Sequence, residues 1–160
     1  NKRLLVIEIK RIYELTKIIM KKFNENYVKI RNTENFDVSF ITSIINSPAL
    51  NSYDSNEAFS ENYISELCSK GYSIVAEEDG KIVGFVVGER LISTTRLLLL
   101  HWIWRSPDAK SMDVYNNLML QCKKDFSYIN SYINEDVTKS FKNQGFNIGN
   151  KILIEVCWSK

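Results

Sequence analysis

The sequence has few of the residues that mark specialised protein classes. Its 160 residues include only 3 cysteines, 2 prolines and 6 glycines, and a single histidine. Cys68, Cys122 and Cys157 form no C-x-x-C pair, so neither a structural zinc site nor a disulfide framework is expected, and a reducing, cytoplasmic environment fits best. The scarcity of proline and glycine excludes collagen-like and proline-rich chains.

The sequence also lacks an excess of charge of either sign, and it lacks long apolar runs. Lys plus Arg number 21 and Asp plus Glu number 19, so the formal net charge is only +2. Nucleic-acid-binding domains concentrate basic residues on one face, and this near-balance argues against a nucleic-acid partner. No apolar run approaches the ~18 residues that a membrane span requires. With 44% hydrophobic and 25% charged residues, the chain has the composition of a soluble globular domain.

Residues 1–26 are expected to form a segment of their own, an amphipathic helix. Its apolar face could pack on the domain, on a second copy of the chain or on a protein partner, and a basic amphipathic helix can also lie on a membrane surface. A signal peptide is not expected, because charges interrupt the apolar stretch and no small-residue cleavage site follows. The apolar residues recur at spacings of three and four: Leu5, Ile9, Ile12, Leu15, Ile19 and Phe23.

Residues 27–160 are expected to form one α/β (α+β) domain. Asp79-Gly80 between two β-rich runs predicts a hairpin, because glycine accepts positive φ, and Thr33 is expected to cap a helix. Residues 96–104 are apolar on both faces, which predicts a central strand. The patterns predict strands at residues 27–31, 72–76, 81–88, 96–104, 128–133 and 151–158, and helices at 33–47, 57–70, 111–126 and 135–143.

Three segments in this order resemble the GNAT superfamily, the GCN5-related N-acetyltransferases, which transfer an acetyl group from acetyl-CoA to an amine. The family's first strand and helix resemble VKIRNTENFDVSFITSIIN, its next hairpin resembles SIVAEEDGKIVGFVVGE, and its last helix and strand resemble NEDVTKSFKNQGFNIGNKILIEVCW. The resemblance covers about residues 27–158. It implies a mixed, mostly antiparallel twisted sheet that is flanked by helices and split between its fourth and fifth strands. It also implies acetyl-CoA or another acyl-CoA as cofactor and a small-molecule or peptide amine as substrate.

The family's cofactor loop has a degenerate form in this chain. Members usually carry V-x-P and then R/Q-x-x-G-x-G/A, where small residues let backbone N–H groups approach the diphosphate. Counted from Pro107, the basic position falls on Lys110 and the glycine positions on Asp113 and Tyr115, and residues 89–144 contain no glycine. By resemblance, the residues expected at the cofactor are Ile103, Arg105, Lys110, Ser111, Met112, Asp113, Val114, Tyr115, Asn134 and Phe141.

The position of the family's catalytic acid is changed too. Many members have a tyrosine four residues before a Gly-Phe pair, where it protonates the leaving thiolate. Here that position holds Phe141, which has no proton to donate. By resemblance, backbone N–H groups around Ile103 to Arg105 would hold the oxyanion. Asn134 matches an asparagine found near the cofactor, or it caps the helix.

Two residues are candidates for the base that takes a proton from the substrate ammonium. His101 lies on the expected fourth strand, where the family often places this base, and an imidazole titrates near neutral pH. Glu89, at the end of the third strand, is the other candidate. Each has a structural alternative, because His101 can be satisfied by its neighbours and Glu89 can be a solvated strand end. Cys122 is expected to pack in the core.

Two functions remain open at this point. The first is an N-acyltransferase that carries acetyl from acetyl-CoA to an amine at an atypical cofactor site. Proximity supplies much of the rate in such a reaction, so the missing acid need not abolish it. The second is a non-catalytic module of the same fold, which binds a protein partner or senses acyl-CoA without turnover.

Overall fold

The computed structural model describes residues 8–17, 28–50, 58–91, 96–133, 137–149 and 154–159. Residues 8–17 are helical, and all of their side chains are exposed. The rest of the expected N-terminal helix lies outside the described residues, so the division into segments 1–26 and 27–160 stays a prediction, as does a partner for this helix. None of the described helices is both long and apolar enough to cross a bilayer.

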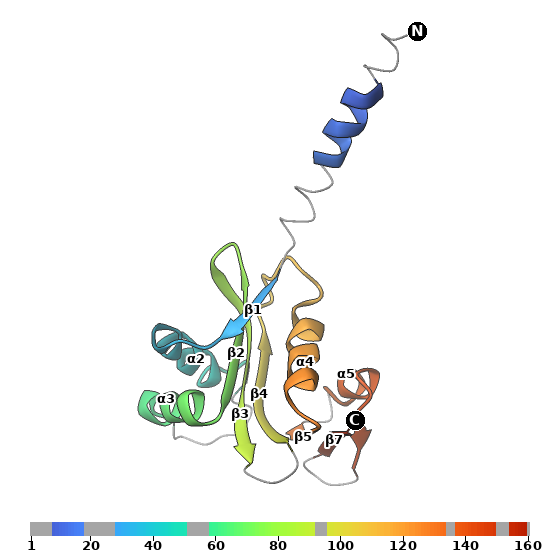
Figure 1. Ribbon diagram of the computed structural model, residues 1–160. Coiled ribbons are helices and arrows are strands. Elements are labelled where there is room, and N and C mark those ends of the chain that lie inside the picture. The colour runs from blue at the N-terminus through green and yellow to red at the C-terminus, as the bar shows by residue number, and fades with distance from the viewer. Residues whose placement is uncertain are drawn as a thin grey trace.

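A seven-stranded sheet forms the centre of the domain (Figure 1). Among the described strands only β4 and β5 run parallel; the other neighbours are antiparallel, which confirms the expected fold class. β4 lies in the middle, as its apolar sequence predicts. In the order β1-β2-β3-β4-β5-β7-β6, the strands are β1 (Lys29–Asn32), β2 (Tyr72–Glu78), β3 (Lys81–Leu91), β4 (Leu97–Arg105), β5 (Tyr128–Ile133), β7 (Ile154–Ser159) and β6 (Asn147–Ile148).

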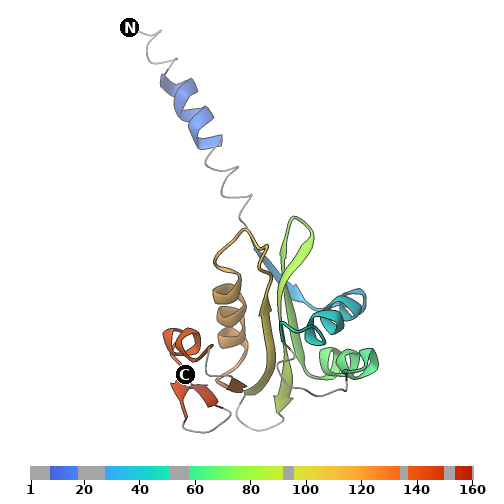
Figure 2. The same ribbon diagram turned by 180° about the vertical axis from the view of Figure 1, so that it is seen from behind.

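Helices cover both faces of the sheet (Figures 1 and 2). A 3₁₀ turn, η1 (Asn35–Asp37), leads into α2 (Val38–Ile45), which lies with α3 (Glu61–Lys70) on one face. On the other face lie α4 (Val114–Asp125) and α5 (Thr138–Asn143). The four expected helices are thus present, each with a later start than the pattern predicted. The two-residue strand β6 was not expected, because so short a run carries no periodicity.

The turn between β2 and β3 is the expected hairpin. Asp79 and Gly80 have φ values of +50° and +74°. Positive φ at both central residues is the geometry that matches the twist of paired strands, and Gly80 adopts it without a Cβ clash. The Asp-Gly signal therefore predicted this turn for the right physical reason.

The sheet separates two hydrophobic cores, because alternate side chains of each strand point to opposite faces. In β2, Ile74 and Ala76 face α4 and Val75 faces α2 and α3. The α4-side core includes Val86, Leu98, Leu100, Val114, Leu118, Met119, Cys122, Phe126, Ile129 and Phe141. The α3-side core comprises Val38, Ile41, Ile45, Ile64, Val75, Phe85 and Val87, with Trp102 and Trp104 packed against it.

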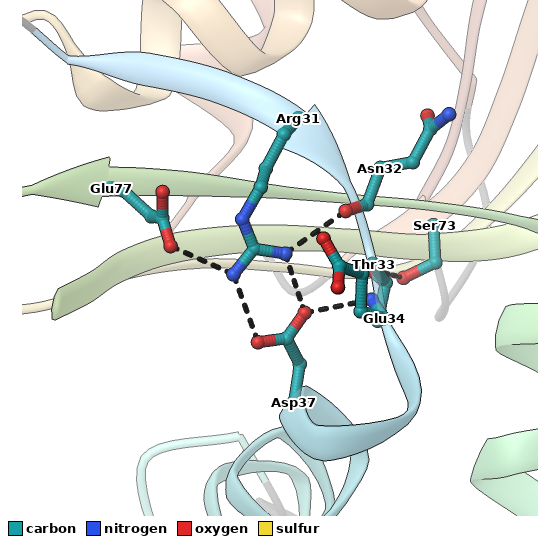
Figure 3. Close-up of polar contacts among 7 residues, drawn as sticks. All are labelled: Arg31, Asn32, Thr33, Glu34, Asp37, Ser73 and Glu77. Carbon is teal, nitrogen blue, oxygen red and sulfur yellow. Dashed lines mark hydrogen bonds and ion pairs between the residues drawn. The ribbon is translucent and has the colours of Figure 1, made fainter. Parts of the chain in front are cut away.

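A charged network joins β1 and β2 to the start of α2 (Figure 3). The guanidinium of Arg31 donates to both carboxylate oxygens of Asp37, at 2.6 and 3.0 Å, and to Oε1 of Glu77 at 2.7 Å. Asp37 is only 2% exposed. Burial disfavours its charged form, but hydrogen bonds from Arg31 and from the backbone N–H of Glu34 outweigh burial and hold the pKa of Asp37 below its ordinary value.

The same region corrects the expectation for Thr33. Its hydroxyl forms a hydrogen bond of 2.6 Å with the hydroxyl of Ser73 on β2, and therefore caps no helix (Figure 3). The backbone N–H of Glu34, at the start of η1, instead donates to Asp37 Oδ2 at 2.8 Å. A side-chain oxygen three residues downstream thus accepts the N–H of the N-cap residue, which is Glu34 and not Thr33.

Candidate active site

A bulge in β4 marks the centre of the candidate site. Between Val87 and Gly88 the register of β3 with β4 shifts by one residue, so His101 has no partner of its own on β3. Leu100, before the bulge, is buried in the α4-side core, whereas Trp102, after it, packs against the α3-side core. In a regular strand these two side chains would share a face. The bulge therefore changes the face of the sheet to which the side chains in the second half of β4 point.

The sheet splits next to this bulge. β4 and β5 pair only as far as Leu100 and Ser131. Beyond that point β5 continues against β7 and β4 continues against β3. The buried hydroxyl of Ser131 donates to the carbonyl oxygen of Leu100 at 2.8 Å and so satisfies the last acceptor before the strands separate. The expected split between the fourth and fifth strands is confirmed, and it begins at His101.

His101 and Glu89 form a pair at the split. His101 Nε2 lies 2.8 Å from Glu89 Oε1, and the two side chains are 28% and 42% exposed. The imidazole ring also packs at a tilt on Trp102, with 5.5 Å between ring centroids. The sequence proposed these residues separately as bases, and the structure brings them within one hydrogen bond. A carboxylate and an imidazole in this arrangement can take up and share one proton while both remain open to solvent.

Glu89 also lines a cavity of about 300 Å³ between α3 and the end of β3. The ammonium of Lys70 pairs with Glu66 at this cavity, and the guanidinium of Arg90 lies over the ring of Phe126, in the α4-side core. Glu89 therefore connects the cavity on the α3 side with His101 at the split. The lining residues are Tyr63, Glu66, Leu67, Lys70, Gly71, Glu89 and Arg90.

Residues 106–113, which join β4 to α4, are held by the β2–β3 hairpin. Glu78 is only 6% exposed. Its Oε2 accepts the backbone N–H of Lys110 at 2.9 Å, and its Oε1 accepts that of Ser111 at 2.8 Å. At the hairpin turn, Asp79 Oδ2 lies 2.8 Å from the ammonium of Lys110. Two consecutive carboxylates of the hairpin thus fix the loop that was expected at the cofactor.

Arg105 supports the same loop at the end of β4. Its Nη2 donates to the carbonyl oxygens of Ala109 and Ser111, both at 3.1 Å. The side chain of Met112 is 80% exposed. The N–H of Asp113 donates to Ser111 Oγ at 3.2 Å. The guanidinium of Arg105 therefore stabilises this loop through hydrogen bonds to its backbone carbonyls.

The other residues expected at the cofactor lie at or near the α4-side core. Val114 and Phe141 are 0% and 2% exposed, and Ile103 packs against the same core. The ring of Tyr115 meets that of Phe141 edge-on at 6.2 Å, and burial raises the pKa of Tyr115 to about 12. Asn134 lies outside the described residues. Contact of any of these residues with a cofactor stays a prediction.

Neither Cys68 nor Cys122, the two cysteines whose side chains the structure describes, is an activated nucleophile. Cys68 and Cys122 are free thiols, and Cys122 is completely buried in the α4-side core, which confirms its expected packing role. Burial raises the pKa of Cys122 to about 12, so its thiolate is scarce near neutral pH. A reducing cytoplasmic location stays a prediction.

Sequence reasoning missed two residues that shape the site, Glu78 and Ser131. Glu78 stood in a Glu-Glu-Asp-Gly run whose composition indicates only a turn, and its partners lie 32 and 33 residues further along the chain. Ser131 stood in an apolar strand as an ordinary polar residue. The signal for Ser131 was its position at a buried place in that strand, where a hydroxyl needs a partner.

Comparisons with known proteins agree with this geometry. No protein-family model and no curated protein matches the sequence. Among solved structures, N-acetylglutamate synthase from Neisseria gonorrhoeae, complexed with coenzyme A and N-acetyl-glutamate, is similar at a TM-score of 0.67 and 14% identity. The match covers 83% of this chain but only 35% of that enzyme, so the chain spans about a third of its length.

Two shorter proteins match over nearly their whole length. A GCN5-related N-acetyltransferase from Rhodopseudomonas palustris has a TM-score of 0.64 at 15% identity, with 82% of this chain and 95% of that chain covered. The PaiA N-acetyltransferase from Thermoplasma acidophilum, in complex with coenzyme A, has a TM-score of 0.58 at 15% identity, with 84% and 99% covered. At such identities the likeness establishes architecture. The chain has the fold of the GCN5-related N-acetyltransferases.

Proposed function

We propose that this protein is an N-acyltransferase, which transfers an acyl group, acetyl in the simplest case, from an acyl-CoA thioester to an amine. A fold alone does not determine an activity. The observation that carries the proposal is the coincidence of three features at one point of the sheet. The β4 bulge, the β4–β5 split and the Glu89–His101 pair all meet at residue 101.

The cavity between α3 and β3 is the proposed site of the acceptor amine. It holds about 300 Å³, enough for a small molecule or the end of a peptide. The carboxylate of Glu89 lines it and suits an ammonium group, whereas that of Glu66 is paired with Lys70. Since Glu89 also reaches His101, an amine bound there lies next to the split. The structure of N-acetylglutamate synthase, which contains N-acetyl-glutamate, supports an amine acceptor by analogy.

In this proposal, Glu89 and His101 remove a proton from the acceptor amine. An aliphatic amine is mostly protonated at neutral pH and becomes a nucleophile only after it loses a proton. Glu89 takes this proton, and His101 shares it through the 2.8 Å hydrogen bond. A bound acyl-CoA supplies the thioester carbon, where a C–N bond forms and the C–S bond breaks. Phe141 has no proton for the departing sulfur, so CoA leaves as a thiolate and takes up, through solvent, the proton that the attacking nitrogen loses as the amide forms.

One observation favours a second candidate, a non-catalytic module that binds a protein partner. The helix at residues 8–17 exposes Ile9, Ile12, Tyr13 and Leu15, each more than half accessible. Exposed apolar side chains on one element are typical of interaction sites. This candidate predicts no release of free thiol with any acyl-CoA and amine.

Turnover of acetyl-CoA against a panel of amines tests the proposal, with release of free thiol as the readout. Glu89→Gln keeps the shape of the side chain but loses the base, and we expect kcat/KM to fall about 100-fold. His101→Gln is expected to lower it as well. Glu61→Gln, at the exposed start of α3, is the matched control and should leave kcat/KM unchanged. Full activity in both pair variants would refute the assignment of the base.

A further inference from the structure

Glu78 places a buried carboxylate against the loop that precedes α4. Its two oxygens accept N–H groups from two consecutive residues, Lys110 and Ser111, at 2.9 and 2.8 Å. Successive backbone N–H groups before a helix are an arrangement that binds anions such as phosphate. The carboxylate of Glu78 is bound in the same manner, and the chain therefore fills this anion position with a charge of its own.

The residues around this position do not fit a diphosphate. Asp79 and Asp113 add negative charge near the loop. The ammonium of Lys110 is bonded to Asp79, and Nη2 of Arg105 is bonded to two loop carbonyls, while the buried Nε of Arg105 has no hydrogen-bond partner. A diphosphate at the N–H groups of Lys110 and Ser111 would have to displace Glu78 and would leave that carboxylate buried without its partners.

The pantetheine arm, the other part of an acyl-CoA, does not have to displace Glu78. The pantetheine arm is uncharged, so Glu78 does not repel it. The split between β4 and β5 and the Glu89–His101 pair lie at residue 101, within β4. The loop begins only after Arg105, where β4 ends. A thioester arm can reach the proposed chemistry without using the N–H groups that Glu78 occupies.

We propose that Glu78 is an internal anion that replaces the diphosphate at the loop, so that the protein selects its acyl donor through the pantetheine thioester arm. The diphosphate of CoA then contributes little to affinity. The inference rests on the proposed function only for the identity of the donor, because the occupied N–H groups are a property of the chain itself.

Calorimetric titration with coenzyme A and, separately, with pantetheine tests the inference. In the wild-type protein we expect the two dissociation constants to agree within about threefold. Glu78→Gln removes the charge and keeps the shape, and it should strengthen coenzyme A binding about tenfold, the effect of one charge-assisted hydrogen bond. Pantetheine binding should not change. Glu61→Gln, which removes a charge at the exposed start of α3, on the other face of the sheet, should keep the wild-type ratio within about threefold.

Two results would overturn the inference: coenzyme A that binds the wild-type protein more than about thirtyfold tighter than pantetheine, or a folded Glu78→Gln protein without a gain for coenzyme A. The wild-type ratio decides the matter even if the variant fails to fold. If the wild-type protein binds neither compound, the proposed function fails, and inorganic pyrophosphate becomes the probe. Amide NMR shifts of Lys110 and Ser111 that move with pyrophosphate in Glu78→Gln, but not in the wild type, support the inference; no movement in the variant overturns it.

Discussion

Glu77 and Glu78 are neighbours on β2 and satisfy their carboxylates in different ways. Glu77 is 19% exposed and accepts from the guanidinium of Arg31, in the network that joins β1 to α2 on the α3 side. Glu78 is 6% exposed and accepts two backbone N–H groups of the loop before α4. Because a strand alternates its faces, two adjacent residues of one type stabilise two different parts of the molecule.

The difference lies in which partner carries the charge. The network of Arg31 balances a cation against two carboxylates, so it depends on the guanidinium. The N–H groups at Glu78 carry no net charge, so the two hydrogen bonds of this carboxylate involve no cation. The first arrangement serves stability, and the second decides what the loop can bind.

The largest effect is expected when the guanidinium is removed. Arg31→Met leaves Asp37, 2% exposed, without its cation. Breaking a buried ion pair on one side is strongly destabilising, and we expect the free energy of unfolding to fall by about 3 kcal/mol. Urea denaturation measures this. Lys29→Met, at an exposed position on the same strand, is the control and should change stability by less than about 0.5 kcal/mol.

The second-largest effect is expected when the carboxylate of Glu78 is removed. Glu78→Ala removes the acceptor from two N–H groups, and we expect a loss of about 2 kcal/mol in the free energy of unfolding, since water replaces part of what is lost. Hydrogen exchange gives the sharper test. The amides of Lys110 and Ser111 should exchange faster, while that of Glu34, which donates to Asp37, keeps its protection. The opposite pattern is expected for Arg31→Met, and equal changes at both places would contradict the comparison.

Local patterns predicted most of the fold, because the causes lie close together in the sequence. The Asp79-Gly80 turn follows from backbone preference at two adjacent residues, and the central place of β4 follows from apolar residues on both of its faces. The site depends on features that local patterns do not contain. The contact of His101 with Glu89 needs a shift of one residue in strand register, which the sequence does not mark.

The bonds of Glu78 were beyond sequence reasoning for another reason. They join a hairpin to a loop that follows 32 residues later, and single-sequence patterns carry no information on such pairs. The resemblance to acetyltransferases predicted a cofactor loop without its usual glycines at these residues, and this stays a prediction. It contained no hint that a carboxylate from β2 takes up the N–H groups of that loop.

Acid should weaken the Arg31 network. The folded-state pKa of Asp37 lies below its ordinary value, so its ionised form favours the folded state. This contribution is complete above the unfolded pKa of about 3.9 and is lost as the pH falls through the lower, folded-state pKa. Urea midpoints at neutral pH and near pH 3 for the wild type and Asp37→Asn measure it. The wild type should lose more stability than the variant, and parallel losses would show that another group titrates.

The smallest effect is expected for Glu77→Gln. The amide oxygen of Gln can still accept from Arg31 Nη2, and Arg31 keeps both bonds to Asp37. Since Glu77 is partly exposed, the lost charge should cost about 0.5 kcal/mol in the free energy of unfolding. The exchange rates of the Lys110 and Ser111 amides should stay at their wild-type values. If this variant speeds their exchange as much as Glu78→Ala does, the two faces of β2 act as one unit, and the separation of a stabilising carboxylate from a ligand-selecting one fails.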